Sequence, residues 1–296
     1  MTTKPNLETD WARAPPPSGP AWRQIANAFY NPEEKSFLGR TPKRWAIVLV
    51  FYSVFYAVLA LMFAACMGGL FLTLDLKTPT YTLGKSLIGS NPGVASRPRP
   101  MDKDAVVRYD SGNSTGVKAY VDQLNEFFGQ DGLATVSVLS EECTFKDNFG
   151  YPDTPCFFVK LNKIIGWKPE CYNDAENLPT EMPEDLKEYI KTVETTKLNQ
   201  IWVSCWEEKS NNTKIEYPWG RGLSADFYPY YKDDTYKSPV VAVKLSAPVN
   251  TPVVVRCRVW AKNVVYNKSL KEPSGYTRIQ LQIEDNTTTD EPKAEN

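Results

Sequence analysis

The residue types that could carry chemistry in this chain are cysteine and the acidic residues, because the sequence contains no histidine. It therefore lacks the commonest general base, every Ser–His or Cys–His nucleophile pair and every histidine metal site. A pair of carboxylates could perform glycosidase chemistry, but no spacing among the scattered acidic residues selects such a pair. The six cysteines form no CxxC motif, which disfavours zinc and thioredoxin-like sites. We expect no catalytic residue, no cofactor and no metal site.

Disulfide formation is the chemistry that the cysteines favour. Five of the six follow residue 140, and disulfides persist outside the cytosol. Cys143 and Cys156 could close a short loop, although a bridge between Cys156 and Cys171 is an alternative. Cys205 and Cys257 could connect two strands across a β-sandwich.

One segment is long and apolar enough to cross a membrane. From Trp45 to Leu74 the sequence contains no Asp, Glu, Lys or Arg, and a hydrocarbon core about 30 Å thick needs roughly 20 apolar helical residues. A buried core helix is rarely so long and so apolar on every side, and a signal-peptide core is shorter and begins earlier. Residues 45–74 are therefore predicted to form a transmembrane helix, in which Cys66 is a small apolar filler.

Charge and glycosylation motifs predict the orientation of this helix. Basic residues lie just before it at Lys35, Arg40, Lys43 and Arg44, whereas only Lys77 and Lys85 follow it closely. Positive charge stays in the cytoplasm, and Trp45 fits an interfacial anchor. Sequons for N-glycosylation all follow the helix, at Asn113, Asn211, Asn267 and Asn286. We expect a single-pass type II glycoprotein of the plasma membrane with a cytoplasmic amino terminus.

The chain divides into five expected parts. Residues 1–44 form a cytoplasmic tail with a proline-rich start, and residues 45–74 form the transmembrane helix. Residues 75–100 are punctuated by prolines and are predicted to be an extracellular stalk. Residues 101–284 form the ectodomain, and the polar residues 285–296 form a flexible carboxyl-terminal tail.

The ectodomain is predicted to be an antiparallel β-sandwich with one or two short helices. Apolar residues recur at helical spacing from Val117 to Phe128, with Ser114 or Thr115 as the cap, and a weaker helix is expected over residues 184–193. Segments rich in Val, Ile, Tyr and Phe alternate with turn residues, which is typical of a sandwich. The predicted strands are Cys156–Ile165, Leu198–Trp206, Pro239–Leu245, Pro252–Lys262 and Tyr276–Ile283.

One face of the membrane helix is aromatic. Tyr52, Phe55 and Tyr56 are spaced i, i+3 and i+4, so they share one side of the helix. Hydroxyl groups of tyrosine inside lipid are poorly satisfied unless a protein partner accepts their hydrogen bonds. Small residues that allow another helix to come close lie at Ala57, Ala60, Ala64, Ala65, Gly68 and Gly69. The face indicates a membrane partner, although a lone span could also carry such residues without one.

Several segments on both sides of the predicted span carry distinctive motifs. Before and within the span, these segments are Phe29–Thr41 (FYNPEEKSFLGRT) and Phe51–Ala60 (FYSVFYAVLA). After the span they are Cys156–Lys163 (CFFVKLNK), Tyr228–Tyr231 (YPYY), Pro239–Val243 (PVVAV) and Val255–Arg258 (VRCR). In this order, around a correctly oriented span, the segments resemble the β subunit of the sodium/potassium-transporting P-type ATPase and its relative in the proton/potassium pump. Together they are more specific than any one of them.

The resemblance implies a non-catalytic accessory subunit. Such a subunit binds the multi-span catalytic α subunit, helps it fold and leave the endoplasmic reticulum, and tunes its affinity for cations. The ectodomain is expected to be immunoglobulin-like and to cover the outer loops of α. Besides α, a small single-span regulatory subunit and membrane lipid are expected partners, whereas the net charge of −1 disfavours nucleic acid. The residues that the resemblance places at the α interface are Tyr52, Phe55 and Tyr56 in the bilayer and Tyr228, Tyr230 and Tyr231 outside it.

The cysteines depart from the family pattern. Vertebrate members have six ectodomain cysteines in three bridges, whereas this chain has five. Cys143, Cys156, Cys205 and Cys257 resemble four of those positions, and we expect a bridge between Cys143 and Cys156 that leaves Cys171 unpaired. This pattern indicates an invertebrate-type member.

Three other functions fit the same topology. A proton/potassium pump β subunit is the nearest alternative, and a cell-surface adhesion glycoprotein could use the same sandwich. A type II membrane enzyme of the secretory pathway also has a tail, a span, a stem and a lumenal domain. The lumenal part lacks histidine, which disfavours the enzyme.

Overall fold

The computed structural model describes residues 20, 22, 25, 29–32, 35–75, 78–87, 89–101, 105–130, 141–233, 236–269 and 271–285. The chain forms two compact units, residues 1–75 and residues 76–296. The sequon at Asn286 and the tail after Asp285 lie outside the described residues.

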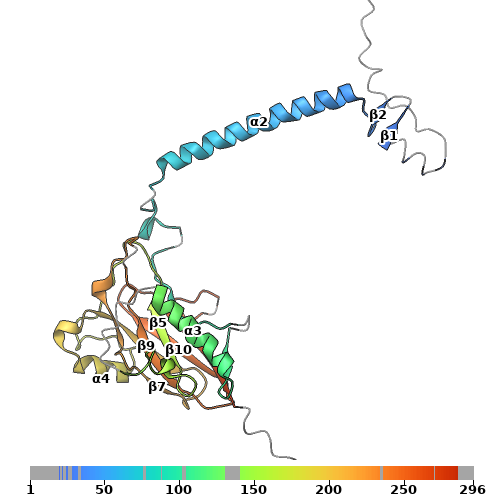
Figure 1. The fold of residues 1–296 in the computed structure, drawn as a ribbon. Helices are drawn as coiled ribbons and strands as arrows, with labels where there is room; N and C mark the ends of the chain where they lie inside the picture. Colours follow the sequence, from blue (N-terminus) through green and yellow to red (C-terminus); the bar gives the residue numbers. More distant parts are fainter. Residues whose placement is uncertain are drawn as a thin grey trace, which may run out of the picture. The chain divides into compact units, whose positions relative to one another are not determined.

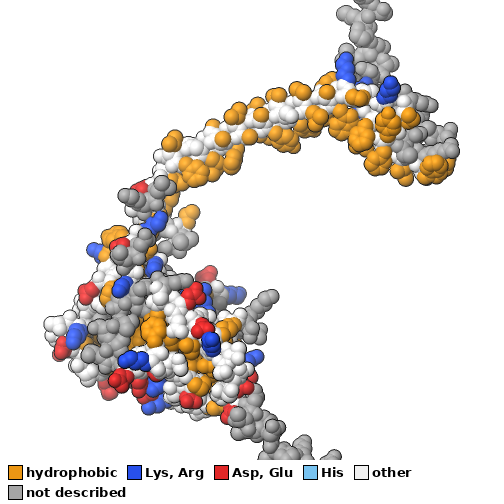
Figure 2. Space-filling model, viewed as in Figure 1, with side chains coloured by type: hydrophobic (Ala, Val, Ile, Leu, Met, Phe, Trp, Pro, Cys, Tyr) orange, Lys and Arg blue, Asp and Glu red, His pale blue; other side chains and the backbone are white. Residues whose placement is uncertain are grey.

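The first unit contains a small hairpin and one long helix (Figure 1). Strands β1 (Tyr30–Asn31) and β2 (Ser36–Phe37) pair in antiparallel register. Helix α2 (Pro42–Thr73) begins with proline in its first turn, where no backbone N–H is needed, and none of its residues is buried. Among the described residues it is the one helix long and apolar enough to cross a membrane. Figure 2 shows hydrophobic side chains along its whole length. The predicted single span is confirmed, and the helix begins three residues earlier than expected.

The second unit is a two-sheet sandwich, which confirms the predicted fold class. One sheet has the strand order β4-β11-β10-β6-β8, and the other has the order β3-β5-β9-β7. The first sheet is built from β4 (Val107–Asp110), β6 (Gln200–Glu207), β8 (Gly222–Ser224), β10 (Val253–Trp260) and β11 (Tyr276–Glu284). The second is built from β3 (Val94–Arg97), β5 (Cys156–Leu161), β7 (Lys214–Glu216) and β9 (Val241–Ser246).

Alternating side chains explain how the two sheets pack. Along β10, Val253, Val255, Cys257 and Val259 are buried, and the residues between them are half-buried. Because successive residues of a strand point to opposite faces, one face of β10 enters the core. Strand β5 is buried at every position, from Cys156 to Leu161. Both sheets contribute to one continuous hydrophobic core.

Helix α3 (Ser114–Gln130) packs against strands from both sheets. The ring of Tyr120 lies 6.2 Å from that of Tyr109 on β4, and the ring of Phe128 lies 4.7 Å from that of Phe158 on β5. The predicted helix is therefore confirmed, but the predicted capping residue, Ser114 or Thr115, was wrong. Asn113 accepts the backbone N–H of Thr115 at 3.0 Å, because the helix begins one residue after Asn113.

Helix α4 (Glu184–Thr192) covers a second, smaller core on the first sheet. Leu186 and Ile190 are fully buried, and they share this cluster with Trp202 of β6 and Trp260 of β10. Neighbouring residues of β6 belong to the main core, so the sheet is covered on both faces here. Short 3₁₀ turns complete the unit at Leu83–Lys85, Asn148–Gly150, Thr195–Lys197 and Ala225–Phe227.

Two features differ from the sequence-based expectation. Strand β3 lies inside the segment expected as the stalk, because Val94 to Arg97 pair with β5 and add an edge to its sheet. Strand β4 pairs with β11 in parallel, so the sandwich is not wholly antiparallel. The chain connects β4 to β11 through most of the domain, which is the kind of long connection that a parallel pair requires.

Candidate partner-binding surfaces

The aromatic face of α2 forms a continuous ridge. The rings of Tyr52 and Tyr56 are stacked with centroids 6.0 Å apart, and Phe55 meets Tyr56 edge-on at 5.4 Å. Tyr52, Phe55 and Tyr56 are 49%, 45% and 61% exposed. Within the described part of the chain, neither tyrosine hydroxyl has a hydrogen-bond partner. The ridge can therefore give both apolar contact and hydrogen bonds to a neighbouring membrane helix.

The segment Tyr228–Tyr231 is held through its backbone against the loop that follows β5. The carbonyl of Tyr230 accepts the N–H of Gly166 at 2.9 Å, and Ile165 and Tyr230 form a parallel bridge. The peptide bond between Tyr228 and Pro229 is cis. Two segments that are distant in the sequence therefore meet here: the loop that follows Cys156–Lys163, through Ile165 and Gly166, and the segment Tyr228–Tyr231.

Lys163 extends this contact with its side chain. Its ammonium lies 5.5 Å from the ring centroid of Tyr230 and 5.4 Å from that of Tyr236, and these two rings meet at 4.7 Å. A cation over aromatic faces is attracted by their electron-rich surfaces. The sequence did not indicate Tyr236, because nothing local relates it to Lys163.

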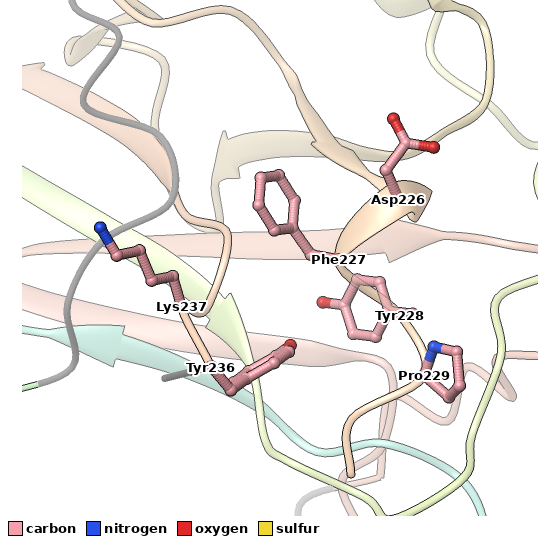
Figure 3. A pocket seen from close by; sticks show the side chains of 6 residues that line it. All are labelled: Asp226, Phe227, Tyr228, Pro229, Tyr236 and Lys237. Atoms are coloured by element: carbon pink, nitrogen blue, oxygen red, sulfur yellow. The ribbon is translucent and has the colours of Figure 1, made fainter. Parts of the chain in front are cut away.

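Figure 3 shows an open depression beside this cluster, with the hydroxyl groups of Tyr228 and Tyr236 pointing into the space between them. Its volume is about 460 Å³, and it is lined by Asp226, Phe227, Tyr228, Pro229, Tyr236 and Lys237. Burial raises the pKa of Tyr228 well above its usual value, with smaller effects from Tyr236 and Cys171. Burial also raises the pKa of Tyr236 to about 12, with a smaller effect from Tyr230. Both phenols are therefore neutral hydrogen-bonding groups at physiological pH.

The predicted contact residues of this region differ in exposure. Tyr231 is 62% exposed, whereas Tyr228 and Tyr230 are half-buried. The ring of Tyr228 packs edge-on against Trp167 at 5.6 Å. Tyr228 is thus packed against the domain, whereas the side chain of Tyr231 is exposed.

Comparison with known proteins agrees with the architecture. The family profile described as "Sodium / potassium ATPase beta chain" matches residues 17–144 and 133–279, which include the aromatic ridge and the tyrosine segment. This chain belongs to the sodium/potassium ATPase beta chain family.

Full-length relatives show how far the beta chain likeness extends. The sodium/potassium-transporting ATPase subunit beta-2 of Drosophila melanogaster is 36% identical and covers 91% of this chain and 94% of its own length. Subunit beta-1 of the same organism is 34% identical over 90% and 94%, respectively. The potassium-transporting ATPase subunit beta of Rattus norvegicus is 24% identical over 86% and 92%.

This beta chain contains two disulfides in the described residues. Cys143 is bonded to Cys156, so the alternative bridge between Cys156 and Cys171 is not formed. Cys171 is a free, buried thiol; its burial raises its pKa to about 11 against a smaller opposing effect of Lys262. Cys66 on α2 is also free.

The second disulfide of the beta chain corrects the expected geometry. Cys205 is bonded to Cys257, and the two are direct partners on β6 and β10, which are neighbours in one sheet. They do not connect the two layers of the sandwich. The reason is topological: β6 and β10 both belong to the first sheet, which the sequence could not specify.

The sequons of the beta chain that the structure describes all lie in the second unit. Asn113 and Asn211 are exposed, and Asn267 is half-buried. The side-chain oxygen of Asn267 accepts the N–H of Ser269 at 3.0 Å. Asn211 is thus the sequon whose asparagine is both exposed and outside any helix cap.

Proposed function

We propose that this chain is the non-catalytic β subunit of a sodium/potassium-transporting ATPase. It binds the catalytic α subunit, assists its folding and export, stabilises it and tunes its cation affinity. The observation that carries this proposal is the match over nearly the full length of relatives named sodium/potassium-transporting ATPase subunit beta. The lower identity to the potassium-transporting relative favours the sodium/potassium pump.

The proposal includes a topology. Residues 1–44 lie in the cytoplasm, residues 45–74 cross the plasma membrane, and residues 75–93 connect the span to β3 of the extracellular sandwich. The basic residues before Trp45 and the sequons after the span support this type II orientation.

Two surfaces are proposed to contact α. In the bilayer, the ridge of Tyr52, Phe55 and Tyr56 packs against α helices, which accept the two tyrosine hydroxyls. This gives a buried partner to polar groups that lipid cannot satisfy. Outside the membrane, Tyr228, Tyr230 and Tyr231 form the docking segment, with the depression beside Tyr236 as its hydrogen-bonding part.

Co-purification tests the proposal directly. The chain is isolated from its native membrane, and the large subunit that co-elutes is identified; a P-type ATPase α subunit is expected.

The variant Tyr52→Phe/Tyr56→Phe should weaken the complex by about 0.6–1.7 kcal/mol per lost hydrogen bond, which lowers recovery of α in detergent.

Ser53→Ala is the matched control, because it removes a hydroxyl from the same helix at a different angle. Recovery of α that is equal for the double variant and wild type across a series of detergents would reject the ridge as the interface. Absence of any co-eluting P-type ATPase would reject the function itself.

A further inference from the structure

The hairpin before the membrane helix is attached to the first turn of that helix. The indole N–H of Trp45 donates to the carbonyl of Phe37 at 2.8 Å, and the rings of these residues are 6.4 Å apart. The guanidinium of Arg40 lies 5.7 Å from the Trp45 ring. Hydrogen bonds in both directions between Phe37 and Arg40 close the second turn. The hairpin, of which the structure describes residues 29–32 and 35–40, is therefore held at the level of Trp45.

The hairpin exposes more apolar surface than a structure of its size can cover. Phe29, Tyr30, Phe37 and Leu38 are 58%, 55%, 52% and 48% exposed. Two strands of two residues cannot bury such side chains against one another, because an isolated hairpin has no core. Figure 2 shows hydrophobic side chains gathered at this end of α2, with basic side chains nearby. Another surface must cover this apolar group.

The position of the hairpin indicates a lipid surface. Helix α2 has 32 residues and is therefore about 48 Å long, which exceeds a hydrocarbon core of about 30 Å. The segment without charges begins at Trp45, so Trp45 lies at the boundary between lipid and water. A hairpin bonded to Trp45 lies among the lipid headgroups, where aromatic side chains are favoured.

Charge indicates the kind of lipid. From Phe29 to Trp45 the sequence has four basic residues and two acidic ones: Lys35, Arg40, Lys43 and Arg44 against Glu33 and Glu34. The cytoplasmic leaflet is negatively charged and attracts basic segments next to a span. We propose that this hairpin, through its described residues 29–32 and 35–40, is a lipid-binding element that inserts its apolar side chains among the headgroups and binds anionic lipid of the inner leaflet. This proposal rests on the proposed orientation of the span but not on the identity of the α partner.

Fluorescence quenching by lipid tests this proposal. The full-length chain carries a single environment-sensitive label at Leu38→Cys, in a Cys66→Ala background, and is reconstituted into nanodiscs. One set contains phosphatidylcholine alone, and the other contains phosphatidylcholine with phosphatidylserine. Nitroxide-labelled headgroups should quench the label, and more strongly with phosphatidylserine.

The variants Lys35→Gln and Arg40→Gln, added to the labelled chain, should reduce the equilibrium constant for contact between the hairpin and lipid by about fivefold per removed charge.

Three controls make the result specific. The parent without Leu38→Cys shows whether the buried Cys171 reacts with the label. A label at Val249→Cys, in the exposed loop between β9 and β10, measures the quenching of an exposed site outside the hairpin. A second label at Tyr30→Cys repeats the measurement if the Leu38 variant does not fold.

Quenching at position 38 no stronger than at position 249 would overturn the proposal. Equal quenching with and without phosphatidylserine would overturn its anionic specificity. Protection of the label that requires a co-purified α subunit, without quenching by lipid, would show that protein covers the hairpin instead and would also overturn it.

Discussion

Glu208, next to the end of β6, is held between two arginines. Its carboxylate accepts hydrogen bonds from Arg256 of β10 at 2.7 Å and from Arg278 of β11 at 3.1 and 3.0 Å. Partial burial raises the pKa of Glu208, but the hydrogen bonds and charges of Arg278 and Arg256 outweigh it and lower the pKa overall. The guanidinium of Arg256 also lies 4.5 Å from the Tyr276 ring centroid. One carboxylate thus links three neighbouring strands of the first sheet.

This cluster predicts sensitivity to acid. Because the folded-state pKa of Glu208 lies below its unfolded value, its stabilising effect is present above a pH of about 4.3 and is lost as the pH falls through the folded-state pKa. Glu208→Gln should lower the free energy of unfolding at neutral pH by about 1–3 kcal/mol and reduce its dependence on pH in the acidic range. Denaturant unfolding of the full chain in detergent at neutral and acidic pH measures both effects.

The exposed Glu188→Gln is the control for this prediction, because it removes one carboxylate from α4. If the stability of Glu208→Gln falls with acid as steeply as that of wild type, the cluster is not the source of the pH dependence.

At the scale of elements, helix α4 is attached to the sandwich by both apolar and polar contacts. Leu186 and Ile190 enter the small core beside Trp202. On the other side, Arg221 forms a 2.8 Å ion pair with Asp185 of the helix and lies 4.3 Å from the Tyr217 ring centroid. The buried arginine keeps the helix against the sheet.

Leu186→Ala should destabilise this element by about 2–5 kcal/mol, because it leaves a cavity in a cluster with few other members. Tryptophan fluorescence should report unfolding at a lower denaturant concentration than in the wild type, since Trp202 and Trp260 line the same cluster. Hydrogen exchange should accelerate within Glu184–Thr192. Glu188→Ala is the surface control. If α4 is equally protected from exchange in Glu188→Ala and in Leu186→Ala, Leu186 does not hold the helix against the sheet.

The elements found from sequence are those whose pattern is long or strong. Helices α2 and α3 have apolar patterns of many residues, and strands such as β10 are rich in branched residues, so local preference and tertiary structure agree. Strands β3, β4, β7 and β8 have three or four residues each and were not predicted. Their pairing depends on partners far along the chain, as in the parallel contact of β4 with β11.

The same limit applies to the site. The aromatic ridge follows from helical spacing alone, so Tyr52, Phe55 and Tyr56 could be grouped from sequence. The meeting of Lys163 with Tyr236 depends on how two loops fold back, and the sequence carries no local sign of it. The placement of Cys205 opposite Cys257 likewise depends on strand order.

At the scale of the whole molecule, the sequons that the structure describes all lie in one of the two units. Asn113, Asn211 and Asn267 belong to the unit after the span, and the basic residues Lys43 and Arg44 precede it. If the span has the proposed orientation, only the second unit meets the glycosylation machinery.

Expression in glycosylating cells tests this expectation. Asn211→Gln should remove one glycan, seen as a step in gel mobility that endoglycosidase treatment abolishes. A sequon introduced before residue 44 should remain unmodified. Modification of that engineered sequon, with bare asparagines after the span, would reverse the proposed topology.

The position of the last strand has a consequence for biosynthesis. Strand β11, Tyr276–Glu284, lies between β4 and β10. Strand β4 therefore has no partner strand in this sheet until β11 has been synthesised. The chain must therefore be synthesised through β11 before the first sheet is complete. Until then the edges of β4 and β10 that pair with β11 stay open, and a chain truncated before Tyr276 would keep them open to pairing with other chains.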